Sequence, residues 1–141
     1  QSDGDGFSES AGRPMRRGIL YKQPQRMSME WPNVFPPLQE RLVGLANFVN
    51  TELQKPLTVT CLARTPEENA RVSGKSDSLH VVSPTRAADI RIHMWVGGKK
   101  TNLYTSEDLN SMQAWWARAG KGWDFVLEKD HVHVEADKRA K

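Results

Sequence analysis

The chain has 141 residues, with 20 basic and 17 acidic side chains and a net charge of +3, a length that predicts one domain burying about two-thirds of its unfolded surface. Both signs of charge are mixed along the chain and no run of about eighteen apolar residues occurs, so neither a nucleic-acid-binding surface nor a membrane span is expected. One cysteine, Cys61, excludes a disulfide framework.

The N-terminal thirty residues are rich in Gly, Ser, Asp, Pro and Arg. They predict a flexible or extended arm over 1–30, in which only residues 19–21 have strand character. The arm also lacks the apolar stretch of a secretory signal. The domain itself is expected over 31–137, and residues 138–141 are expected to form a solvated tail.

The first elements of the domain follow from hydrophobic periodicity. Apolar residues recur at helical spacing over 37–54, which predicts a helix. The alternating run 57–62 predicts a strand in which Cys61 is a small buried hydrophobe. Thr65 followed by Pro66 indicates a short helix over 66–72, and a polar loop then leads to His80.

The second half of the chain contains more strands than helices. Residues 86–93 alternate and predict a strand on which Asp89 faces away from the apolar layer. A hairpin-like turn is expected at 97–98, and a helix from Thr105 to Gly120. Residues 123–127 and 131–135 predict one broken strand or two short ones. The expected fold is α+β, a small antiparallel sheet packed against two to three helices.

Three of the four histidines fall into two clusters that indicate a zinc site. A zinc ion that catalyses hydrolysis takes about three imidazole or carboxylate ligands and keeps one position open for water. His80, Asp89 and His133 can supply these ligands, and Asp130, three residues before His133, can accept a proton from the water. His93 shares the face of Asp89, but a lone strand histidine usually has a structural role, so it is left out of the ligand set.

Two segments carry a resemblance to a known family. Residues 78–90 (SLHVVSPTRAADI) and 130–135 (DHVHVE) resemble zinc metallopeptidases of the D-alanyl-D-alanine carboxypeptidase and dipeptidase type, which include phage endolysins that cut L-alanyl-D-glutamate bonds in peptidoglycan. The family pattern is S-x-H-x-x-G-x-A-x-D-[IL], followed by acid-x-x-H or H-x-H. The likeness covers roughly residues 38–136. This chain has eight residues between the first histidine and the aspartate where the family usually has six, with Pro84 near the usual glycine.

The resemblance implies a Zn²⁺-dependent peptidase that cuts peptidoglycan stem peptides containing D-amino acids, as a DD-carboxypeptidase or an endolysin-type endopeptidase. It implies a protein that is periplasmic, secreted or phage-encoded and acts on the cell wall. The chain is expected to be a monomer. It assigns the ligand role to His133, and places His131 beside the activated water. Arg64 would hold a substrate carboxylate or the oxyanion, and Ser78 would hydrogen-bond to substrate or near His80.

Alternatives remain open at this point. Glu128 could be the base, with His131 as the ligand in place of His133. The chain could also be a catalytically inactive zinc-binding recognition domain, as the related signalling domain of hedgehog proteins shows is possible for this fold. A third possibility is a wall-binding domain without metal.

Overall fold

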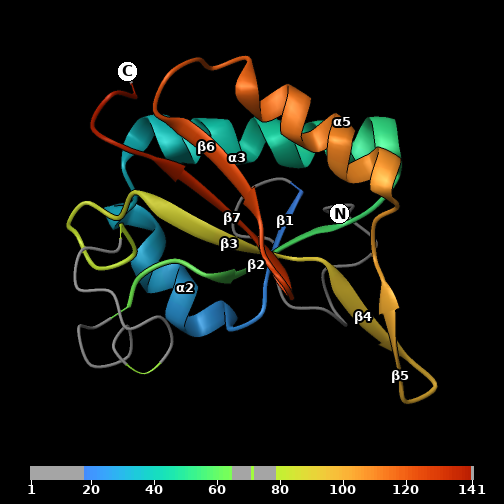
Figure 1. The fold of residues 1–141 in the computed structure, drawn as a ribbon. Helices are drawn as coiled ribbons and strands as arrows, with labels where there is room; N and C mark the ends of the chain where they lie inside the picture. The colour runs from blue at the N-terminus through green and yellow to red at the C-terminus, as the bar shows by residue number, and fades with distance from the viewer. Residues whose placement is uncertain (1–17, 65–70, 72–78, 141) are drawn as a thin grey trace.

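The structure is a computed structural model that describes residues 18–64, 71 and 79–140. It is α+β, with a five-stranded sheet and three α-helices in the described part (Figure 1). The strand order is β1-β2-β3-β7-β6. The bounds are β1 Ile19–Tyr21, β2 Leu57–Cys61, β3 Ala87–Arg91, β6 Trp123–Leu127 and β7 His131–Ala136.

The sheet is mixed, which corrects the expectation of a purely antiparallel one. β1 runs parallel to β2, whereas the β2-β3, β3-β7 and β7-β6 pairs are antiparallel. The parallel strand comes from the N-terminal segment, which the sequence did not place in the sheet. The four antiparallel strands coincide with the predicted ones to within a few residues.

The helices α3 and α5 also follow the predicted pattern. α3 (Pro36–Phe48) continues into a π-helical turn, η2 (Val49–Leu53), so that together they span the predicted helix. α5 (Ser106–Ala117) begins with a capping box in which Thr105 and Asp108 each accept a hydrogen bond from the other's backbone N–H. The expected helix over 66–72 lies outside the described residues apart from Arg71.

The hydrophobic core lies between the sheet and the pair α3 and α5, which run side by side over one face (Figure 1). Ile90 of β3 and Val132 of β7 point to this face and are fully buried, as are Leu42 of α3 and Trp116 of α5. Because successive strand residues point to opposite faces, the polar neighbours of Ile90 and Val132 project from the other side of the sheet. That side carries the candidate site.

The N-terminal segment differs from the expected arm. Residues 19–21 are buried in the sheet edge as β1, and α2 (Pro24–Glu30) packs beside them through buried Met27. α2 also holds the chain beyond β2: Arg26 donates to the carbonyl of Ala63 at 2.9 Å, and Glu30 accepts from the backbone N–H of Ala63 at 3.2 Å. Residues 18–30 therefore belong to the domain, whereas residues 1–17 lie outside the described residues.

Two further segments complete the fold. β4 (His93–Val96) and β5 (Lys99–Asn102) form a separate hairpin that projects from the body, with the expected turn at Gly97 and Gly98 in left-handed backbone geometry (Figure 1). At the C-terminus Ala140 is buried against the core, so the predicted solvated tail is wrong at that residue. No helix among the described residues is long and apolar enough to cross a bilayer.

Candidate metal centre

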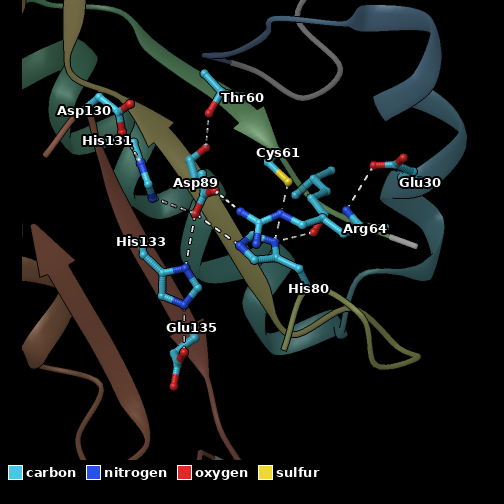
Figure 2. A network of polar contacts seen from close by, with 12 residues as sticks. Glu30, Thr60, Cys61, Arg64, His80, Asp89, Asp130, His131, His133 and Glu135 are labelled. Carbon is cyan, nitrogen blue, oxygen red and sulfur yellow. Dashed lines mark hydrogen bonds and ion pairs between the residues drawn. The ribbon is translucent and has the colours of Figure 1, made fainter. Parts of the chain in front are cut away.

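Asp89 lies at the centre of a cluster of imidazoles on the side of the sheet that faces away from α3 and α5 (Figure 2). Its Oδ1 atom is 3.1 Å from His80 Nε2, 3.2 Å from His133 Nδ1 and 3.6 Å from His131 Nε2. Its Oδ2 atom accepts a hydrogen bond from Arg64 Nη2 at 3.0 Å. The rings of His80 and His133 meet edge to face, with centroids 5.1 Å apart. The structure thus brings the three predicted zinc ligands together, with His80 and His133 both facing the carboxylate of Asp89.

Strand register explains most of this convergence. Asp89 pairs with His133, and Arg91 pairs with His131, across the β3-β7 ladder. Directly opposed residues share a face, so both histidines of the His-x-His motif project beside Asp89. His80 comes from the loop before β3 and is almost fully buried. Its carbonyl accepts from the backbone N–H of Arg64 at 3.0 Å, which ties that loop to the end of β2.

In each of the three imidazoles, the ring nitrogen that faces away from Asp89 is also hydrogen-bonded. In each ring one nitrogen faces Asp89 and the other donates to an oxygen. The three pairs are His80 Nδ1 with the Leu62 carbonyl at 2.6 Å, His131 Nδ1 with Asp130 Oδ1 at 2.8 Å, and His133 Nε2 with Glu135 Oε1 at 2.8 Å. Metal-ligating histidines are typically oriented by such a bond from the second nitrogen to a carboxylate or carbonyl.

The cluster contains both cationic and anionic side chains when no metal is bound. Burial alone would lower the pKa of His80 and of His133, but hydrogen bonds to Asp89 raise both pKa values to about 9. Burial alone would raise the pKa of Asp89, but hydrogen bonds from His133 and His80 hold it well below its usual range. Two cationic rings and one anionic carboxylate therefore stabilise the metal-free fold at neutral pH.

These pKa shifts predict opposite pH dependences for folding and for metal binding. The unfolded pKa of histidine is about 6.5, so His80 and His133 stabilise the metal-free fold fully below that pH and lose the effect as pH rises through about 9. The lowered pKa of Asp89 adds stability above about pH 4 that is lost as pH falls further. Zinc needs neutral imidazoles, so its affinity should rise between about pH 6 and pH 9.

The measurement is thermal unfolding in a chelator across this range, paired with zinc titration against a competing indicator. We expect the melting temperature of the metal-free protein to fall by several degrees from about pH 6 to about pH 9.5, while the apparent zinc affinity increases. A melting temperature that does not change over this interval would contradict the assigned charge states of the two histidines.

The other predicted site residues occupy different positions. Asp130 lies just before β7, and its side chain is 68% exposed and bonded to His131. Arg64 is only 12% exposed and reaches Asp89 directly. Glu128 is exposed and lines a separate pocket with Lys55 and Tyr104. Ser78 lies outside the described residues.

Two residues near the cluster were not predicted to belong to it. Glu135 bonds to His133, and the spacing of two on one strand is a signal that could have identified it. Cys61 was expected in the core, but it is half-buried on the site face, with Sγ 3.8 Å from His80 Nδ1. An irregularity in the β2-β3 pairing between Val59 and Cys61 places it opposite Asp89. No sequence pattern indicated this irregularity.

The donor chemistry of the cluster fits zinc. Imidazole nitrogen, carboxylate oxygen and thiolate sulfur are the atoms that bind zinc in proteins. Ligand atoms of Cys61, His80 and Asp89 all lie within 4.8 Å of one another, and His131 and His133 adjoin this group through Asp89. Comparison with models of protein families, with curated proteins and with solved structures gave no match.

Proposed function

We propose that this chain is a zinc-dependent peptidase that hydrolyses peptide bonds in peptidoglycan stem peptides. One observation supports the zinc site above all. Three imidazoles each present one nitrogen to Asp89 Oδ1, and each gives the other nitrogen to a fixed acceptor. Metal-ligating histidines almost always have this orientation, with one nitrogen directed at the centre and the other hydrogen-bonded to an oxygen. The choice of substrate rests on the resemblance of residues 78–90 and 130–135 to the peptidoglycan peptidases.

In this proposal His80, Asp89 and His133 hold the zinc ion. Such a bound zinc ion lowers the pKa of water and polarises the carbonyl group to be cleaved. The hydrogen bonds from His80 to Leu62 and from His133 to Glu135 fix the two rings in the orientation that ligation needs. Arg64 holds the second oxygen of Asp89, which leaves Oδ1 directed at the histidines.

Asp130 is the group that removes a proton during hydrolysis. Its exposed carboxylate lies at the border of the cluster and is bonded through Oδ1 to His131. A carboxylate in this position can accept a proton and later deliver it to the leaving amine. The hydrogen bond from His131 lowers the pKa of Asp130, with a smaller contribution from Lys100, so the carboxylate is ionised at neutral pH. His131 then positions Asp130 relative to the reacting atoms.

The test is hydrolysis of purified bacterial cell walls, followed as the release of new amino groups. We expect release by the zinc-loaded protein, loss of release after chelation, and recovery when zinc is returned. Elemental analysis should find about one zinc per chain. Release that is insensitive to chelation would overturn the metallopeptidase proposal. Stoichiometric zinc without any release would instead identify a zinc-binding recognition domain.

A further inference from the structure

The β4-β5 hairpin exposes apolar side chains that lie outside the hydrophobic core formed by the described residues. Trp95 is 71% exposed, Met94 and Val96 are exposed as well, and all four residues of β5 are exposed. The hairpin projects beyond the sheet and the helices (Figure 1). A tryptophan held on a projecting element adds little to folding, because its ring stays in water. Such exposed apolar surface commonly marks an interaction site.

The chemistry of the hairpin restricts what it can bind. Trp95 pairs with Lys100 and Val96 pairs with Lys99 across the two strands, so the indole and one ammonium group share a face. Residues 93–102 contain no aspartate or glutamate. The hairpin therefore offers an aromatic surface beside positive charge. Its partner should combine an apolar ring face with negative charge.

The hairpin also borders the candidate metal centre. β4 begins two residues after β3, the strand that carries Asp89. Lys100 lies close enough to Asp130 to contribute to its lowered pKa, after the stronger hydrogen bond from His131. Trp95 lies six positions after Asp89, which corresponds to at most about 20 Å at the rise of a strand. A polymer bound at the centre can therefore continue along the hairpin.

We propose that the Trp95 and Lys100 face of the hairpin binds the glycan strand of peptidoglycan next to the cleavage site. The indole stacks on the C–H face of a sugar ring, and Lys100 pairs with a carboxylate of an adjacent stem peptide. The identity of the polymer rests on the proposed function, whereas the binding itself needs no hydrolysis. A glycan strand is favoured over an anionic lipid surface because the charge lies beside a single flat ring and beside the candidate site, and not over a broad basic face.

The experiment measures retention of the zinc-free full chain on insoluble purified peptidoglycan, so that catalysis plays no part. We expect Trp95→Ala to weaken retention about tenfold, which is the effect of about 1.4 kcal/mol. Lys100→Ala should weaken it less and reduce its dependence on salt. Met29→Ala is the matched control, because Met29 is 82% exposed and belongs to α2, which lies apart from the hairpin (Figure 1). Circular dichroism should show that each variant is folded.

Three outcomes decide the proposal. Retention that falls for Trp95→Ala and not for Met29→Ala supports it, even if cell walls are never hydrolysed and the proposed function fails. Equal retention of Trp95→Ala and the unmodified chain overturns it. Binding to vesicles of phosphatidylglycerol that depends on Trp95, without Trp95-dependent retention on peptidoglycan, also overturns it and assigns the hairpin to a lipid surface.

Discussion

Asp89→Asn is expected to abolish cell-wall hydrolysis and to lower zinc affinity at least about 100-fold. Asp89 Oδ1 is the atom that three imidazoles face, and a neutral amide is a poor ligand for zinc. The metal-free fold should lose about 3–5 kcal/mol of unfolding free energy, because Arg64 and two cationic rings would lose their buried anion. Elemental analysis, chelator competition and denaturant unfolding measure these effects.

The matched control is Asp108→Asn. Asp108 is also an aspartate in a hydrogen-bonded ion pair, with Lys55, but it lies at the start of α5 and outside the cluster. This variant should keep its zinc and its activity, and lose about 1 kcal/mol from the weakened cap. If Asp89→Asn retained zinc as tightly as Asp108→Asn does, the candidate centre would not be a metal site.

Asp130→Asn is expected to reduce hydrolysis by a factor of about 10²–10⁴, the usual contribution of a general base, while zinc content stays unchanged. The carboxylate is 68% exposed, so the amide can replace it without a burial cost. The amide oxygen can still accept the hydrogen bond from His131 Nδ1, which keeps that ring in place. Initial rates on cell walls and zinc analysis of the same samples separate the two effects.

Glu128→Gln serves as the control for this experiment. Glu128 is an exposed acid two residues from Asp130 and lines a different pocket, so its replacement should leave the rate nearly unchanged. The reverse result, full activity in Asp130→Asn and loss in Glu128→Gln, would assign the base to Glu128. It would also favour His131 as the ligand in place of His133.

Hydrophobic periodicity predicted the elements that position the site. Alternation placed Asp89 on the polar face of its strand, and the equal parity of His131 and His133 placed both on one side. The same alternation would direct Asp130 to the opposite face from His133. The structure avoids this conflict because β7 begins at His131. Asp130 therefore lies just outside the strand, and its side chain accepts a hydrogen bond from His131. The pairing of β3 with β7 itself had no local signal in the sequence.

Short or irregular features were harder to predict from the sequence. β1 has three residues, within a region whose Gly, Ser and Pro content indicates disorder. Its place in the sheet depends on β2, nearly forty residues further along the chain, and not on its own composition. Cys61 reaches the site through an irregularity in strand pairing, which depends on tertiary packing. Local patterns contain no information about such distant partners.

The N-terminal segment limits how far the chain can be shortened, because β1 pairs with β2 and α2 is hydrogen-bonded to the backbone of Ala63. In a fragment that begins at Trp31, the edge of β2 that pairs with β1 would have unpaired backbone N–H and C=O groups. Bare strands of this kind recruit other chains and promote self-association. The fragment would also free the backbone next to Arg64, the residue that braces Asp89. The N-terminal segment thus covers one edge of β2 and fixes the backbone beside the candidate metal centre.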